Sequence, residues 1–206
     1  MTTALTIFLL AVVVPVFFGK TRSAPAWLTL QALALAAIGF AQHAQVSVHT
    51  VAALAEVVLV RALIAPWLLR RAIRRHGGPD GDLMPSNLFA WAVAIALVVL
   101  AFEFGAPAAD ARHAMTLGAV AATVAVALLL LATSSAATTQ LVAVLYMENA
   151  LGLFETLLPE PWPLPVHLAL GLIYVGTVAV GSWLIGAPEV AAAGPAEPHD
   201  PQGEMP

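Results

Sequence analysis

Long apolar runs separated by short polar links constrain the fold of this 206-residue chain more than any other feature. A helix needs roughly 17 to 25 mostly apolar residues to cross a bilayer. Because lipid offers no hydrogen-bond partners to an open backbone, such runs must be helical. The sequence therefore predicts an all-α, polytopic membrane bundle within residues 1–186, with about seven transmembrane helices. We place these helices near residues 2–18, 24–42, 46–69, 86–104, 114–134, 138–158 and 164–186.

The composition supports the bilayer as the solvent for most of the chain. Apolar residues make up 61% of it and charged residues only 10%, whereas roughly a quarter of the residues in a soluble domain are charged. No polar segment is long enough for a soluble catalytic domain of about 100 residues, so we expect no catalysis by this chain alone. Residues 187–206 are rich in Pro and Ala and hold several acidic residues, which predicts a disordered tail.

Common catalytic and ligand-binding motifs are absent from the sequence. It contains no cysteine, which excludes disulfides and thiolate-held iron–sulfur clusters. It also lacks a phosphate-binding loop, a zinc-protease motif and a nucleophile elbow, and its histidines have no recognisable metal-ligand spacing. We expect no bound cofactor, no metal and no nucleic-acid partner.

Basic residues predict the orientation in the membrane. Lys20 and Arg22 lie in the first link, and four arginines between Arg70 and Arg75 lie in the third. An excess of basic residues in short loops marks the cytoplasmic side. We therefore expect the N-terminus outside and the C-terminus in the cytoplasm, with helices that are sequential in the chain packed as antiparallel neighbours.

Glu148 lies in the middle of the apolar stretch 138–158 and is followed by Asn149. An ionisable group near the bilayer midplane costs several kcal/mol unless it faces protein or water, so its first interpretation is functional. The alternative is a protonated carboxyl group that is hydrogen-bonded between helices. Glu155 follows seven residues later on the same face, about 10 Å nearer the outside. The two carboxyl groups could form a two-step proton relay, or Glu155 could be an ordinary interfacial residue.

Two further segments carry candidate proton-path residues. In the third helix, Glu56 and Arg61 lie about 140° apart round an α-helix, so we expect no simple pair between them. Arg61 either extends towards the basic end or acts as a fixed charge on a carboxylate of a neighbouring helix. His167, near the start of the last helix, could titrate near neutral pH or be a satisfied interfacial residue.

The run QLVAVLYMENALGLFETLL, preceded by SSAATT and followed by a Pro-rich turn and a last apolar helix, resembles component E of hydrogenase-4. The similarity extends to TLQALALAAIGF, which contains Gln31, and to VLVRALIAPWLLRRAIR, which contains Arg61 at a position where the family commonly has lysine. That family supplies a membrane subunit of formate hydrogenlyase-type and related group 4 nickel–iron hydrogenase complexes. Its last three helices, here residues 114–186, look like the small K subunit of respiratory complex I. His167 and the pair Ile173-Tyr174 stand where the resemblance leads us to expect acidic residues.

The resemblance implies a non-catalytic integral membrane subunit that helps couple redox chemistry to proton translocation, with Glu148 as a buried carboxyl group of the proton path. The implied partners are large antiporter-like membrane subunits and peripheral redox subunits, in the bacterial inner membrane. Two alternatives stay open from the residues: a subunit of a multi-subunit cation/proton antiporter, and a structural scaffold in which Glu148 stays protonated. We expect this last version to tolerate Glu148→Gln.

Overall fold

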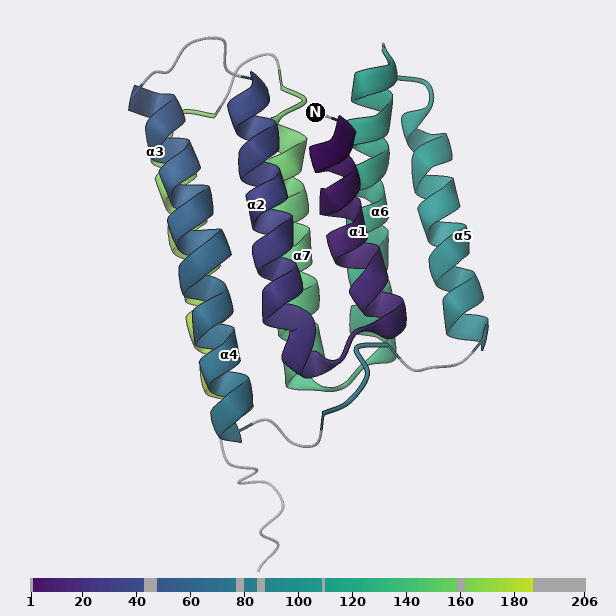
Figure 1. Cartoon of the computed structure of the whole chain (residues 1–206), viewed down its shortest axis with the longest axis vertical. Helices are drawn as coiled ribbons and strands as arrows, with labels where there is room; N and C mark the ends of the chain where they lie inside the picture. The colour runs from purple at the N-terminus through teal and green to yellow at the C-terminus, as the bar shows by residue number, and fades with distance from the viewer. Residues whose placement is uncertain are drawn as a thin grey trace, which may run out of the picture.

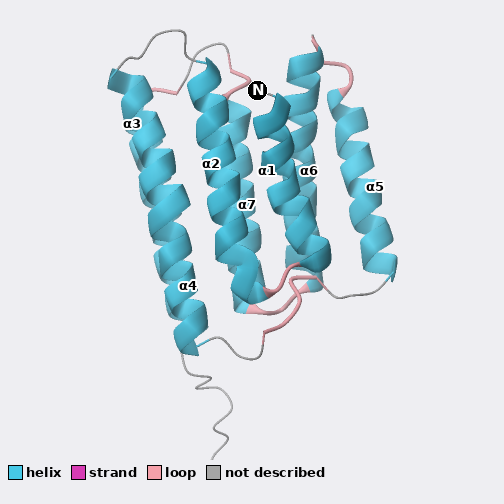
Figure 2. Cartoon of the chain, in the orientation of Figure 1, coloured by secondary structure: helices cyan, strands magenta, loops and turns pink. Residues whose placement is uncertain are grey.

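The computed structural model describes residues 2–42, 48–76, 80–84, 88–108, 110–158 and 162–186. These residues are helical apart from short connections, and they contain no strand beyond one isolated bridge between Lys20 and Asp82 (Figure 2). The all-α prediction is therefore confirmed for the described part of the chain. The predicted tail at 187–206 lies outside the described residues.

Each predicted apolar segment is helical, with ends within a few residues of those expected except in the third segment. A 17-residue α1 is followed by a short 3-10 turn, η1, and the third segment is one continuous rod made of α3, the π-helical η2 and α4. The elements are α1 (Thr2–Phe18), η1 (Thr21–Ser23), α2 (Ala24–Gln42), α3 (Val48–Glu56), η2 (Val57–Ile64), α4 (Ala65–His76), α5 (Leu88–Gly105), α6 (Ala111–Thr133), α7 (Ala137–Glu155) and α8 (Leu164–Gly186).

Within the described residues, five helical stretches are long and apolar enough to cross a membrane. They are Thr21–Gln42, Thr50–Arg75, Leu88–Gly105, Ala111–Thr133 and Leu164–Ile185. Large apolar side chains on α5 and α8 are also exposed, for example Phe89 at 80% and Leu172 at 75%. Such exposure is costly in water and ordinary in lipid. The chain is thus a multi-pass membrane protein whose helices contact the bilayer.

The helices form two stacked layers of three. One layer holds α1, α2 and the rod α3-η2-α4, and the other holds α6, α7 and α8 (Figure 1). Each member of one layer packs on its counterpart in the other: α1 on α6, α2 on α7, and α4 on α8. α5 lies outside this arrangement and packs on α6. The four helices α2, η2, α7 and α8 therefore meet in the half of the bundle remote from α5.

Sequential antiparallel packing is confirmed for most links but is wrong between α4 and α5, which lie at opposite ends of the layers (Figure 1). The part of the connection that the structure describes, residues 80–84, lies across the end of the bundle and pairs with the turn after α1. The main-chain N–H of Thr21 donates to the Gly81 oxygen at 3.0 Å, and that of Leu83 to the Gly19 oxygen at 3.2 Å. Because Leu83 is only 1% exposed, this crossing is part of the packed structure.

The third predicted segment also ends later than expected. We predicted a loop from Arg70 onward, but α4 continues to His76 and carries the four arginines on its last turns. Cations near a helix C-terminus interact favourably with the helix dipole, and arginine is a good helix former. Arg70 and Arg74 line a common hollow with Arg22, which confirms that the two basic segments meet at one end of the bundle.

At the opposite end, Asp110 caps α6. Its carboxylate accepts hydrogen bonds from the main-chain N–H of His113 at 2.8 Å and lies 2.8 Å from the His113 ring nitrogen Nδ1. The main-chain hydrogen bond, and then the bond to the ring, hold the pKa of Asp110 below its ordinary value. Since an N-cap carboxylate stabilises the helix that follows, Asp110 fixes where α6 begins.

Candidate functional site

Glu56 and Arg61 form an ion pair in the middle of the rod α3-η2-α4. Arg61 Nε lies 3.1 Å from Glu56 Oε1, and the two side chains are 9% and 7% exposed for Glu56 and Arg61 respectively. Our prediction that these residues do not pair is wrong. The reason is the π-helix from Val57 to Ile64, in which hydrogen bonds span five residues, so that positions five apart lie about one turn apart.

Arg61 extends across the bundle instead of towards the basic end. Its Nη1 donates to the main-chain oxygen of Glu148 at 2.9 Å. Its guanidinium also lies over the ring of Tyr174 on α8, 4.8 Å from the ring centre. A fixed positive charge is thus held between η2, α7 and α8, and the snorkelling interpretation does not apply.

Two glycines make room for this ion pair. A Cβ on Gly171 of α8 would lie 2.9 Å from Glu56 Cγ and 3.1 Å from its Oε1. A Cβ on Gly152 of α7 would lie 3.0 Å from Leu35 and 3.5 Å from Arg61 Nη1. The absence of a side chain at both positions lets the charged pair pack against the neighbouring helices.

Glu148 faces α8, close to the ion pair. Its Oε1 accepts a hydrogen bond from the Thr177 hydroxyl at 3.0 Å, while its Oε2 is buried without a hydrogen-bond partner among the described residues. Arg61, which pairs with Glu56, donates to the main-chain oxygen of Glu148, so the ion pair lies next to this residue. Glu148 is therefore a buried carboxyl group with one free oxygen beside a fixed charge.

Asn149 joins the two layers. Its side-chain amide donates to Gln31 Oε1 on α2 at 2.8 Å, and both side chains are fully buried. A hydrogen bond between side chains inside a membrane protein is a specific contact between helices. The pairing fixes α7 against α2, while the adjacent Glu148 faces α8. We call Gln31, Glu56, Arg61, Glu148, Asn149, Tyr174 and Thr177 the buried polar cluster.

Glu155 and His167 meet near the end of the bundle remote from the arginines. His167 Nε2 lies 2.8 Å from Glu155 Oε1, and the side chains are 12% and 14% exposed for His167 and Glu155 respectively. The same oxygen accepts the main-chain N–H of Trp162 at 3.0 Å. Glu155 thus connects the C-terminal end of α7 to the start of α8.

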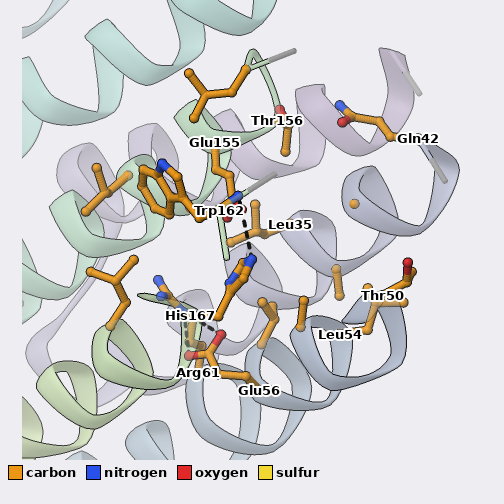
Figure 3. A pocket seen from close by; sticks show the side chains of 18 residues that line it. Leu35, Gln42, Thr50, Leu54, Glu56, Arg61, Glu155, Thr156, Trp162 and His167 are labelled. Carbon is orange, nitrogen blue, oxygen red and sulfur yellow. Dashed lines mark hydrogen bonds and ion pairs between the residues drawn. The ribbon is translucent and has the colours of Figure 1, made fainter. Parts of the chain in front are cut away.

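A cavity of about 340 Å³ connects these groups (Figure 3). It lies between α2, the rod α3-η2-α4, α7 and α8, and both ion pairs are at its wall. Its polar lining residues are Gln42, Thr50, Glu56, Arg61, Glu155, Thr156, Trp162 and His167. A cavity of this size and polarity has room for several water molecules.

The predicted site residues thus fall into three places. Glu56 and Arg61 line the inner part of the cavity, Glu155 and His167 lie nearer its outer end, and Glu148 and Asn149 lie in the buried polar cluster beside it. From the sequence we assigned no role to Gly171 or Thr177 and identified Tyr174 only as a departure from an acidic pattern.

The chemistry available here is proton binding by carboxyl and imidazole groups beside a permanent positive charge. Arg61 does not give up its proton at physiological pH, so it can only act on the groups around it. Among the described residues, no group of three or more His, Asp or Glu side chains is arranged to hold a metal ion.

Comparisons with protein-family models, with curated proteins and with solved structures find no match to this chain.

Proposed function

We propose that this protein is a non-catalytic membrane subunit of a hydrogenase-type or complex I-like assembly in the bacterial inner membrane, and that it helps couple redox chemistry to proton movement. The observation that carries the proposal is the buried polar cluster, in which Glu148 lies beside the Glu56–Arg61 ion pair at the end of a polar cavity. In this proposal α1, α2, the rod α3-η2-α4, α5, α6, α7 and α8 all cross the membrane, with the N-terminus outside.

The position of the cavity indicates from which end of the bundle protons would enter. Its lining includes the C-terminal end of α2 at Gln42 and the first turn of α3 at Thr50, both at the end remote from the arginines. Water and protons would enter there, pass the Glu155–His167 pair and reach Glu56 and Arg61. Since Arg61 contacts the main-chain oxygen of Glu148, a small change at the ion pair acts directly on the segment that carries the Glu148 carboxyl group.

A permanent charge near a carboxyl group is what a coupled proton site requires. Inside a protein, movement of a charge by a few ångströms changes the energy of a neighbouring carboxylate strongly because the effective dielectric constant is low. A partner subunit that shifts α7 or α8 would therefore change the proton affinity of Glu148. In the proposal, the large antiporter-like subunits supply that movement and peripheral redox subunits drive it.

The experiment is purification of the tagged chain in mild detergent from its own cells, followed by mass spectrometry and metal analysis. Multi-helix subunits together with nickel–iron or iron–sulfur proteins are the expected result. Multi-helix subunits without metal proteins would replace the proposal with a cation/proton antiporter, and recovery of the chain alone would refute the assembly.

Proton coupling is tested separately with Glu148→Gln. Its matched control is Glu103→Gln, which alters an exposed carboxyl group on α5. In inverted membrane vesicles, we expect redox-driven acidification to fall severalfold with Glu148→Gln and to persist with Glu103→Gln, while both variants still assemble. Equal acidification by the two variants would leave Glu148 with a structural role only.

A further inference from the structure

A hollow at the basic end of the bundle is lined by Arg22, Arg70, Ile73 and Arg74. Arg22 comes from η1, whereas Arg70 and Arg74 are one turn apart on α4. The packing of α4 against η1 brings these separate parts of the chain together. Three guanidinium groups therefore converge from two elements that the fold, and not the sequence, places side by side.

None of these three arginines forms an ion pair within the described part of the chain. The ion pairs recorded there involve Arg61, His113 and His167, and none involves an arginine of the hollow. An acidic residue does lie beside η1: the Asp80 carboxylate accepts the main-chain N–H of Arg22 at 3.1 Å. Guanidinium groups that share a hollow repel one another, and a phosphate relieves the repulsion with charge-assisted hydrogen bonds.

The same face of the rod continues into the membrane as an apolar surface that runs from α4 into η2. Leu63, Trp67, Arg70 and Arg74 follow one another at intervals of four, three and four residues, so they share one face of the helix. Leu63 is 55% and Trp67 is 56% exposed. Tryptophan is enriched where a helix meets the headgroup region. A ligand of this surface has both a phosphate and a hydrocarbon chain.

We propose that the hollow binds the headgroup of an anionic phospholipid, with an acyl chain lying along Trp67 and Leu63. The lipid phosphate occupies the space between the three arginines, and the chain covers the exposed stripe. The inference is independent of proton coupling, because it concerns the opposite end of the bundle from the cavity.

The test uses the full chain, purified in detergent and freed of lipid, with native mass spectrometry to count bound lipids. Phosphatidylglycerol is compared with phosphatidylcholine of the same acyl chains. The variant Arg74→Gln is compared with Arg75→Gln, which removes the same charge from the same turn of α4 but outside the hollow. Arg71 is left unchanged, because its guanidinium lies over the Trp67 ring at 5.5 Å. Arg22→Gln provides a second, independent disruption from η1.

We expect phosphatidylglycerol to bind about fivefold more weakly to Arg74→Gln, more weakly to Arg22→Gln as well, and almost normally to Arg75→Gln. Equal loss in Arg74→Gln and Arg75→Gln would overturn the site in favour of diffuse attraction. Equal binding of phosphatidylcholine would also overturn it. Displacement of the lipid by millimolar inorganic phosphate would identify a site for free phosphate instead.

Discussion

Gly171 offers the sharpest test of how the Glu56–Arg61 pair is packed. A methyl group at this position would lie 2.9 Å from Glu56 Cγ, which is closer than carbon atoms approach without strain. Glu56 would have to move by several tenths of an ångström, and its bond to Arg61 would lengthen or break. Gly176, on the same helix, is the matched control because a Cβ there meets nothing within 4 Å.

The expected magnitudes follow from two opposing effects. Replacing a helical glycine by alanine stabilises a helix by up to about 1 kcal/mol, and Gly176→Ala should show this gain. Overpacking a tight contact costs about 1 to 3 kcal/mol, so Gly171→Ala should be less stable than Gly176→Ala by that amount. For a chain of this size, the difference corresponds to about 2 to 12 °C in Tm.

The assay is thermal unfolding of both variants in the same detergent. A second pair of measurements places the alanine substitutions in a Glu56→Ala background, where the clash has no partner. There, Gly171→Ala should be as stable as Gly176→Ala, since the penalty depends on the Glu56 side chain. Equal stability of the two variants in the unmodified chain would refute the proposed packing of Glu56 against α8.

Three other predictions follow from the same structure. Glu56→Gln leaves the buried Arg61 without its counter-charge, so it should lower the free energy of unfolding by about 3 to 5 kcal/mol; a loss below 1 kcal/mol in chemical denaturation would contradict this. Because its N-cap hydrogen bonds lower the pKa of Asp110 in the folded chain, its contribution to stability should be present at pH 7 and disappear as the pH falls below about 4. Asp110→Asn, which still caps, should lose that dependence in Tm measurements from pH 3 to 7. Finally, the chain has no native cysteine, so a single introduced cysteine can be labelled selectively. Leu54→Cys in the cavity wall should react with a membrane-impermeant maleimide added from the non-basic side, while Val178→Cys, which is fully buried elsewhere, should not react. Labelling of Leu54→Cys only from the basic side would contradict the proposed entrance of the cavity.

The positions of the helices could be predicted because lipid leaves an apolar run no alternative to a helix. The layer arrangement could not be predicted in the same way. Link length favours neighbouring helices, but α4 and α5 lie at opposite ends of the layers. Between them in the chain, the buried side chains of Leu83 and Met84 stabilise residues 80–84 against the end of the bundle. Nothing in the polar composition of that link indicates that two of its apolar residues are buried.

The sequence was sufficient to predict which residues belong to the candidate site, but not which of them are in contact. An isolated Glu or Arg in an apolar run is visible in any sequence, and this drew attention to Glu56, Arg61 and Glu148. Their geometry depends on the π-helical stretch Val57–Ile64, which is made of the same aliphatic residues as an ordinary α-helix. Gly171 was missed because glycine is common in membrane helices, and its role is visible only with Glu56 beside it.

The polar route in this subunit is asymmetric, and the asymmetry bears on how the proposed function would work. The cavity reaches Glu56, Arg61 and Gly152 from the non-basic end, and Glu148 lies one turn further along α7. Beyond Glu148, Leu141 packs directly against Gly181 of α8, and Val178 is fully buried. A tightly packed apolar contact carries no water, so a proton that reaches Glu148 has no wet path along this interface to the basic end. We therefore expect the second half of the path either to belong to a partner subunit or to open only when α7 and α8 separate. If it opens between α7 and α8, Leu141→Ser should increase proton leak through the isolated subunit. If it belongs to a partner subunit, the same substitution should leave the leak unchanged.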